Sequence, residues 1–373
     1  MKILFTGGGT GGHIFPLIAI TREIKKTHPS DAEFSYMGPR DGFASKALFE
    51  EGIKTYFILS GKARRYLTPV SILQNIFDIF IKIPLGTIQA FLILFFTAPD
   101  IIVSKGGYGS VPAVIAGWVL QIPIFLHESD SVPGLANRLL GKLSRMIFVS
   151  FPINQTESFP LKKMVFTGNP IREELLEVNV NETRQILKLT TGKPIITILG
   201  GSQGSTRIND LVLEILPQLL TNFELIHQTG QKDFENIKDE SVALVPEELR
   251  SGYHIYPFLE ENEFKHALAA AKCVVARAGA GTIAEIAAFG RASILIPLPE
   301  AAQNHQAKNA YAYAKTGACI VIEEGNLKPN FFLEKLIDLV KFGDLNAMAR
   351  AAVNWSRPEA AKVIAQTLLQ FLN

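Results

Sequence analysis

The sequence has few of the residues that mark secreted, metal-binding or disordered proteins. Its 373 residues include only Cys273 and Cys319 as cysteines, and these lie far apart without a metal-ligand spacing. This scarcity argues against a disulfide scaffold and a zinc site, and it fits a reducing cytosol. Charged residues are also scarce, at 19% against 47% hydrophobic residues. With this composition the chain has enough apolar residues to form hydrophobic cores, and disorder is not expected.

The sequence also lacks a strong overall charge, and its first residues do not predict a leader peptide. The formal net charge is +2, so we expect no nucleic-acid partner, and any charged partner must be recognised by a local patch. The apolar run at residues 3–5 is too short for a signal peptide. The length favours two domains. We predict them at residues 1–168 and 169–353, with a C-terminal helix at about 354–373 joining the first domain.

Two stretches, half a chain apart, share one pattern of strand, glycine turn and helix. Residues 3–6 are apolar and lead into Gly7–His13, after which a helix is predicted at 14–26 with Pro16 in its first turn. Residues 194–199 lead likewise into Gly200–Ser205, and a helix is predicted from about 208 to 220. Such turns bring backbone amides close to phosphate groups.

Further short apolar runs alternate with helical stretches and indicate buried parallel strands. The candidate strands are residues 34–37, 101–103, 124–126, 146–149, 165–167, 224–226, 254–256, 273–276, 293–296 and 319–322. The sequence therefore predicts an α/β protein with two Rossmann-like, doubly wound domains that face each other across a cleft.

Other functions of glycine turns must be considered first. Gly7, Gly9 and Gly12 satisfy the dinucleotide pattern G-x-G-x-x-G, but that function requires an acidic residue at the end of the second strand, where residues 36–39 contain none. Neither turn continues into the Gly-Lys-Ser/Thr of a P-loop. Glycines that serve only tight turns remain an alternative, although two matching sites weaken it.

Seven motifs, in order along nearly the whole chain, resemble the MurG family of peptidoglycan N-acetylglucosaminyltransferases, which are GT-B glycosyltransferases. The motifs are residues 8–13 (GGTGGH), 106–108 (GGY), 127–134 (HESDSVPG), 167–172 (TGNPIR), 200–204 (GGSQG), 277–285 (RAGAGTIAE) and 304–310 (NHQAKNA). One motif alone would be weak, whereas this ordered set is specific. The resemblance implies no cofactor and no metal.

The resemblance implies that the C-terminal domain holds UDP-N-acetylglucosamine. Glu285 would accept from the ribose hydroxyls, Ser202 would contact the diphosphate, and Gln306 would bind sugar hydroxyls. Leu259 matches a position whose backbone reads the uracil edge, and Arg172 a position near the uracil. The full predicted set is Thr10, Gly11, Gly12, Asp130, Arg172, Ser202, Leu259, Ala280, Gly281, Thr282, Ile283, Ala284, Glu285 and Gln306. A solvated helix carboxylate is the alternative interpretation of Glu285.

The resemblance assigns the acceptor to the N-terminal domain. Thr10, Gly11, Gly12, Gly107 and Tyr108 resemble positions that face the acceptor diphosphate and the sugar. His13 is the preferred general base, since a histidine near neutral pKa can take the proton of an attacking hydroxyl. Alternatively His13 only caps its helix or binds phosphate. The rival candidates for the base are Glu128 and His127.

One departure from the family pattern lies beside these candidates. Many relatives have Gln-Asn where this chain has Ser129 and Asp130, and the family's Asn contacts the donor sugar. Asp130 replaces an amide with a carboxylate that only accepts hydrogen bonds, so the family contact does not transfer unchanged. Glu128 and Asp130 superficially resemble a metal-binding acidic pair, but the resemblance implies no required metal.

An apolar region follows the basic residues Lys62, Arg64 and Arg65. Residues 70–83 form an amphipathic pattern with a wide apolar face, Pro84 is expected to break the helix, and a second apolar run covers 90–96. Polar residues and Pro84 interrupt every window of about 20 residues, so no transmembrane helix is predicted. The region either covers the N-terminal sheet, or contacts an anionic membrane surface through its apolar face and basic residues.

The implied reaction is an inverting transfer of N-acetylglucosamine from UDP to the 4-hydroxyl of undecaprenyl-diphosphate-linked muramyl-pentapeptide. The expected location is the cytoplasmic face of a bacterial inner membrane, with peripheral attachment. Three alternatives remain open. They are a glycolipid synthase with a diacylglycerol acceptor, a sugar-nucleotide epimerase of the same fold, and a non-catalytic membrane-associated sugar-nucleotide binder.

Overall fold

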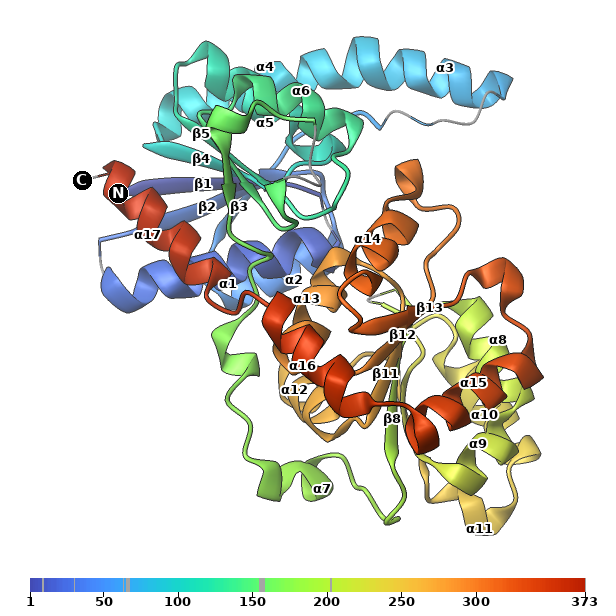
Figure 1. Cartoon of the computed structure of the whole chain (residues 1–373). Coiled ribbons are helices and arrows are strands. Elements are labelled where there is room, and N and C mark those ends of the chain that lie inside the picture. Colours follow the sequence, from blue (N-terminus) through green and yellow to red (C-terminus); the bar gives the residue numbers. More distant parts are fainter. Residues whose placement is uncertain are drawn as a thin grey trace. The chain divides into compact units, whose positions relative to one another are not determined.

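The computed structural model describes residues 1–372 except 9, 30, 63, 65–67, 154–157 and 202. The chain forms two compact units, one of Met1–Arg172 with Pro358–Asn373 and one of Glu173–Arg357. The first unit extends past the boundary predicted after residue 168, because residues 169–172 pack with it. Figure 1 shows the elements of both units along the chain.

The first unit is built on a parallel sheet with the strand order β3-β2-β1-β4-β5-β6-β7. The strands are β1 (Lys2–Thr6), β2 (Glu33–Gly38), β3 (Lys54–Phe57), β4 (Ile101–Ser104), β5 (Ile124–Glu128), β6 (Met146–Val149) and β7 (Met164–Phe166). The chain moves outward in one direction from β1 to β3 and in the other from β4 to β7. The carboxyl ends of β1 and β4 therefore flank a topological switch point, where ligands bind in open α/β sheets.

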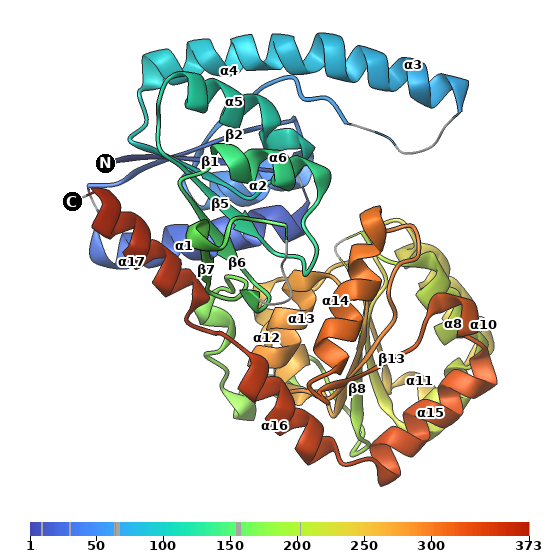
Figure 2. The ribbon, with the colours of Figure 1, turned by 45° about the horizontal axis from the view of Figure 1, so that its top comes forward.

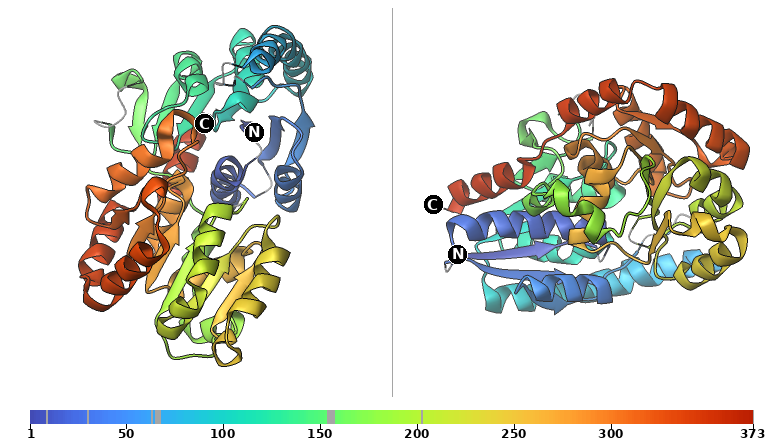
Figure 3. Two further views of the ribbon diagram at one scale, coloured as in Figure 1. Left: turned by 90° about the vertical axis from the view of Figure 1, so that its right-hand side faces the viewer. Right: turned by 90° about the horizontal axis from the view of Figure 1, so that it is seen from below.

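Helices cover both faces of this sheet. They are α1 (Gly11–Thr27), α2 (Gly42–Glu50), α3 (Pro69–Phe77), α4 (Ile83–Thr97), α5 (Val111–Val119), α6 (Leu135–Leu143) and α17 (Ala360–Leu372). The C-terminal helix α17 packs against α1 and returns the chain end to the first unit (Figure 3). Its Ile364 and Leu368 are fully buried beside Phe5 and Phe125 of the sheet.

A single long helix replaces the interrupted one expected around Pro84. A π-helical turn at Asp78–Lys82 joins α3 to α4, so that Pro69–Thr97 runs as one helical segment of 29 residues (Figure 2). In this turn the Ile83 N–H donates to the Asp78 carbonyl, one residue further back than in an α-helix. The wider turn directly precedes Pro84, whose missing N–H is tolerated at the start of α4. The predicted break is therefore wrong.

By length and composition alone, this segment is a candidate membrane span, contrary to the sequence expectation. The mean hydropathy of its most apolar 18-residue window is 2.0, and 17% of that window is buried in the protein. Its exposed residues include Phe80 and Phe96, at 72% and 80%. The other side of the helix packs on the unit, with Ala90 and Leu94 in the core.

The second unit has a parallel sheet in the order β10-β9-β8-β11-β12-β13. The strands are β8 (Ile195–Leu199), β9 (Glu224–Gln228), β10 (Tyr253–Tyr256), β11 (Cys273–Ala276), β12 (Ser293–Leu295) and β13 (Cys319–Val321). Its helices are α7 (Thr183–Ile186), α8 (Thr206–Glu214), α9 (Leu216–Asn222), α10 (Phe234–Leu244), α11 (Glu247–Arg250), α12 (Glu261–Ala270), α13 (Ala280–Ala288), α14 (His305–Ala314), α15 (Pro329–Phe342) and α16 (Leu345–Trp355). The switch point lies between β8 and β11.

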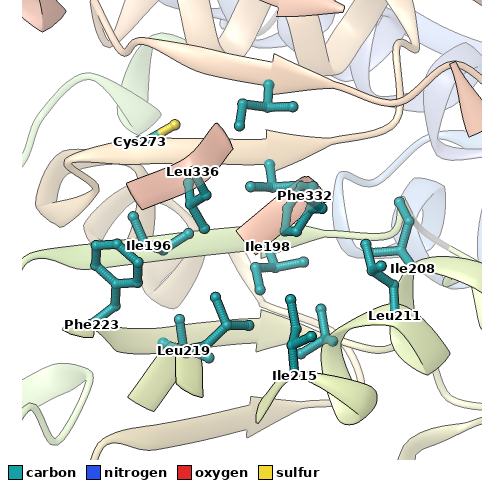
Figure 4. Packing of buried hydrophobic residues seen from close by; sticks show 14 of the residues in the cluster. Ile196, Ile198, Ile208, Leu211, Ile215, Leu219, Phe223, Cys273, Phe332 and Leu336 are labelled. Carbon is teal, nitrogen blue, oxygen red and sulfur yellow. The ribbon is translucent and has the colours of Figure 1, made fainter. Parts of the chain in front are cut away.

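Apolar side chains from strands and helices close this second core. Figure 4 shows Ile196 and Ile198 of β8 against Phe332 and Leu336 of α15, all fully buried. The helix predicted at about 208–220 is two helices, because Pro217 supplies no N–H and the chain leaves helical geometry at Ile215 before α9 begins. The two Rossmann-like sheets confirm the predicted fold class.

Candidate functional site

A glycine turn leaves β1 at the switch point of the first unit. The buried Tyr36 hydroxyl donates to the carbonyls of Gly7 and Gly8, at 2.9 and 3.1 Å. Burial raises the pKa of Tyr36 far above its ordinary value, so the hydroxyl keeps its proton and remains a donor. The turn then enters α1 through Thr10, whose side chain makes no capping bond to the helix amides. Gly9 lies outside the described residues.

His13 lies between the two glycine loops of this unit. Its Nδ1 is 3.0 Å from the Thr10 hydroxyl, which orients the half-buried ring. A Cβ at Gly8 would come within 2.9 Å of Nδ1, and one at Gly107 within 3.3 Å of Nε2. Glycine at both positions therefore leaves room for the imidazole. His13 and Gly107 belong to different sequence motifs, which the resemblance assigned to the acceptor side, and the structure brings them close together.

The second loop follows β4 and is held by a chain of hydrogen bonds. Gly107 has a φ of +78°, and its N–H donates to Asn137 Oδ1 at 3.0 Å. Asn137 Nδ2 donates to Glu128 Oε2 at 2.7 Å, and Glu128 Oε1 accepts from the Asp130 N–H at 2.9 Å. Both carboxylate oxygens of Glu128 are thus used within the protein. This geometry favours a bracing role for Glu128 over a role as the base.

His127 is the third candidate for the base, and it is fully buried. Its Nε2 lies 3.2 Å from the Ser150 hydroxyl and 3.4 Å from the Gly168 carbonyl. Burial, aided by the positive charge of Lys105, holds the pKa of His127 well below its ordinary value. A neutral imidazole sealed in the core has no route to a substrate hydroxyl, so the geometry favours His13.

Lys105 is a residue of this site that the sequence analysis missed. It directly precedes Gly106 and Gly107, yet its side chain is among the most deeply buried in the chain. The ammonium donates to the Ser129 hydroxyl. Burial lowers the pKa of Lys105, while the nearby carboxylates of Glu128 and Asp130 oppose that shift. The sequence signal that could have identified Lys105 is its place directly after a buried strand.

Three other predicted residues of the first unit differ in exposure. Tyr108 is 39% exposed, and Asp130 is half-buried. Arg172 is buried, with its guanidinium carbon 4.2 Å from the centroid of the Phe15 ring of α1. This cation–π contact fixes the side chain that was predicted to lie near the uracil.

A second glycine turn leaves β8 in the other unit, and a glutamine holds it. Gly204 has a φ of +78°, and a Cβ there would collide with the Thr229 carbonyl at 2.1 Å. Gln228 Nε2 donates to the Gly201 carbonyl at 2.8 Å, and its Oε1 accepts from the Leu259 N–H at 3.0 Å. Gln228, missed by the sequence analysis, therefore links the turn to the predicted uracil-reading backbone. Ser202 lies outside the described residues.

Arg277 ties the same turn to the next strand. Its Nη2 donates to the Ser205 hydroxyl at 2.7 Å and lies 2.6 Å from Glu324 Oε2. Its Nη1 donates to the Ile296 carbonyl at 3.2 Å. The buried guanidinium is therefore occupied by the protein itself. Arg277 supports the turn, and this role explains why an arginine stands at the start of the 277–285 motif.

Helix α13 begins beside this turn without a side-chain cap at Gly279. Its first amides therefore make no side-chain capping bond, and a helix N-terminus favours anions. Glu285 lies one turn further on and is half-buried. Ile283, another residue predicted to bind the donor, has its side chain fully buried in the core. Only its backbone could therefore contact the donor.

Gln306 on α14 completes the predicted donor set. Its Oε1 accepts from the Leu298 N–H at 2.9 Å. That bond fixes the amide orientation and leaves the NH2 group as the donor toward a ligand hydroxyl. The loop before α14 places Gln303 and Asn304 in left-handed backbone conformations, at φ of 58° and 54°.

Sequence comparisons identify relatives along the whole chain. The model of the glycosyltransferase family 28 N-terminal domain matches residues 3–149, and that of the C-terminal domain matches residues 195–368. A UDP-N-acetylglucosamine–N-acetylmuramyl-(pentapeptide) pyrophosphoryl-undecaprenol N-acetylglucosamine transferase of Listeria monocytogenes serotype 4a (strain HCC23) is 38% identical, covering 100% of both chains. A Bacillus cereus (strain ATCC 10987 / NRS 248) protein of that name, numbered 2, is 34% identical, covering 100% of this chain and 99% of its own.

Solved structures resemble this chain over its length. The crystal structure of Acinetobacter baumannii MurG is 25% identical, with a TM-score of 0.73 and 99% of each chain covered. The UDP-GlcNAc 2-epimerase of Neisseria meningitidis bound to UDP-GlcNAc is 17% identical, with a TM-score of 0.66, and the match covers 99% of this chain and 100% of the epimerase. The second likeness concerns the fold alone.

Proposed function

Because this chain belongs to glycosyltransferase family 28, we propose that it transfers N-acetylglucosamine from UDP-N-acetylglucosamine to an N-acetylmuramyl-(pentapeptide) pyrophosphoryl-undecaprenol acceptor. The observation that carries this proposal is the 38% identity, over the full length of both chains, to a transferase of that name. The glycine turns at both switch points support it, because each leads into the N-terminus of a helix, where amides suit a diphosphate.

The first unit binds the acceptor and supplies the base. The acceptor 4-hydroxyl gives its proton to the neutral imidazole of His13 while its oxygen bonds to the anomeric carbon. The bond from that carbon to UDP breaks, and UDP leaves with the electron pair, so the anomeric configuration inverts. The Thr10 hydroxyl, 3.0 Å from Nδ1, orients the ring so that Nε2 is the atom offered to the acceptor.

The second unit binds the donor. Amides of the Gly200–Ser205 turn and of the α13 N-terminus stabilise the charge that develops on the departing diphosphate. Glu285 accepts from the ribose hydroxyls, and Gln306 donates its amide hydrogens to the sugar. The Leu259 N–H is used by Gln228, so its carbonyl is the group left for the uracil edge.

The long helix at Pro69–Thr97 seats the first unit on an anionic membrane without crossing it. Gln89 accepts from the Leu59 N–H at 2.9 Å, and Arg64 and Lys82 each lie 2.7 Å from the buried Asp78 carboxylate. The bonds of Gln89 to Leu59 and of Asp78 to Arg64 fasten one side of the helix to the unit, and the apolar side remains exposed. Of the three basic residues predicted to meet head groups, Arg64 is paired with Asp78. Arg65 lies outside the described residues. Lys62 is exposed and can therefore contact head groups.

An acceptor comparison tests the proposed reaction. We expect radiolabel from UDP-N-acetylglucosamine to enter lipid only when the muramyl-pentapeptide lipid is present. Label in diacylglycerol would instead indicate a glycolipid synthase. Conversion of the donor without any lipid would indicate an epimerase, and UDP binding without turnover would indicate a non-catalytic binder.

A further inference from the structure

Ser205 stands at the N-terminal cap of α8, directly after the glycine turn that leaves β8, yet it does not cap the helix. Its backbone is extended, and its side chain makes no hydrogen bond to the first amides of α8. Serine is preferred at such a position because its oxygen usually accepts from one of these amides. The hydroxyl of Ser205 is therefore engaged elsewhere.

The buried Arg277, directly after β11, occupies this hydroxyl. Its Nε and Nη2 donate to Ser205 Oγ at 3.1 and 2.7 Å. A hydroxyl oxygen has two lone pairs with which to accept hydrogen bonds. Because Arg277 uses both, the serine has no acceptor left for an amide of α8 while the guanidinium stays in this place.

Glu324, in the segment after β13, fixes that guanidinium. Its Oε2 forms an ion pair with Arg277 Nη2 at 2.6 Å, and its Oε1 pairs with Arg207 in the first turn of α8. The carboxylate side chain is 8% exposed. A buried guanidinium is costly without an anionic partner. Glu324 therefore compensates the charge of Arg277 and holds it beside Ser205.

We infer that Glu324 is a positioning residue of the donor site, which acts through Arg277 to keep Ser205 from capping α8. The first amides of this helix then remain available to a phosphate of a nucleoside diphosphate. The turn before them lies at the switch point between β8 and β11, where such anions bind. The inference rests on the proposed function, in which this turn binds the diphosphate. Loss of the carboxylate charge would free the hydroxyl to cap the helix in competition with the phosphate.

The Kd of UDP, measured by calorimetry in two backgrounds, tests this chain of contacts. Glu324→Gln keeps the shape and removes the charge, and we expect it to raise the Kd about tenfold, which corresponds to a serine cap. In the Ser205→Ala background the same change should alter the Kd by less than about threefold, because no hydroxyl is left to cap the helix. Glu323→Gln is the matched control with an expected wild-type Kd, since the neighbouring Glu323 carboxylate accepts from the Tyr311 hydroxyl at 2.7 Å.

Two results would overturn the inference alone, with UDP binding by the wild-type protein intact. An equal loss of affinity in both backgrounds would show that Glu324 only stabilises the fold, and an unchanged Kd in Glu324→Gln would remove it from the donor site. Thermal unfolding shows whether each variant is folded. If Glu324→Gln is not, Glu324→Asp, which shortens the side chain and keeps the charge, is measured in the same backgrounds with the same expectation. If the wild-type protein binds no UDP, the proposed function fails and the inference fails with it.

Discussion

At the scale of single residues, the candidate site depends on side chains that are hydrogen-bonded within the protein. Tyr36, Asn137, Gln228 and Arg277 each hold a glycine turn or its neighbour in place. The motifs predicted where the turns lie, because glycine is needed where a Cβ would collide. Arg277 stands within a motif, but the motifs did not reveal that any of these four residues supports a turn, because each reaches its turn through the tertiary fold from elsewhere in the sequence.

Asn137→Ala should damage catalysis through the loop that Asn137 holds. The change removes the acceptor of the Gly107 N–H and one partner of the buried Glu128 carboxylate. We expect about 1–3 kcal/mol of lost unfolding free energy and a fall in kcat with little change in donor KM. Urea unfolding and steady-state kinetics measure both. Arg138→Ala, next to it on α6, is the control, and equal effects of the two changes would contradict the bracing role.

Two buried histidines should make stability fall at acid pH. Burial lowers the pKa of His227 to about 3 and that of His127 well below 6.5. Since the unfolded chain binds these protons more readily, the stabilisation is present above about pH 6.5 and is lost as pH falls below it. Each histidine contributes a slope of about 1.4 kcal/mol per pH unit there.

Urea unfolding at about pH 7.5 and 5.5 measures this slope. We expect His227→Gln to make the unfolding free energy of its unit less dependent on pH, and His127→Gln to do the same for the first unit. His28→Gln, at a half-buried position, controls for the removal of an imidazole. An unchanged pH dependence in both buried variants would show that these histidines bind protons as readily in the folded protein as in the unfolded chain.

At the scale of elements, the hydrophobic pattern predicted most of the strands. The exceptions are an edge strand and the helix at Pro69–Thr97. The edge strand β3 was missed because Lys54–Phe57 is short and half-exposed, without the apolar run that marked the others. The helix at Pro69–Thr97 was expected to break at Pro84, because a sequence pattern does not reveal the π-helical turn that precedes it. Gly86, where a Cβ would lie 1.8 Å from the Leu59 carbonyl, lets the chain pack directly on this helix.

Phe80→Ser and Phe96→Ser should weaken membrane binding without changing the fold. Both rings are largely exposed, so their loss leaves no cavity in the core. Burial of a phenylalanine ring contributes about 1.5–3 kcal/mol, so we expect each change to lower the affinity for anionic vesicles about tenfold or more. Phe342→Ser, an equally exposed ring on α15, is the control. Vesicle sedimentation that gives equal binding for all three variants would remove this helix from the membrane contact.

At the scale of the whole molecule, the fold repeats one arrangement of sheet, turn and helix. Each unit has a parallel sheet with a switch point and a glycine turn that enters a helix there. The sequence predicted both units because the turn motifs and the buried strands are local signals. It placed the division near residue 168, whereas the first unit includes Arg172, whose guanidinium packs on Phe15.

Leu368→Ala should destabilise the first unit, although it lies at the far end of the chain. Leu368 is fully buried where α17 packs against the sheet and α1. We expect a loss of about 2–5 kcal/mol in unfolding free energy from the cavity. Differential scanning calorimetry measures it, with the exposed Val363→Ala of the same helix as control. An unchanged transition in the leucine variant would mean that α17 contributes nothing to this unit.

The most direct test of the account compares His13→Ala with Glu285→Ala in steady-state transfer to the lipid acceptor. In the proposed reaction, His13 of the first unit removes the proton and Glu285 of the second unit binds the donor. We therefore expect a fall in kcat of about 10²–10⁴-fold for His13→Ala with little change in donor KM. For Glu285→Ala we expect a donor KM raised about tenfold. Wild-type turnover in His13→Ala would contradict the proposed reaction.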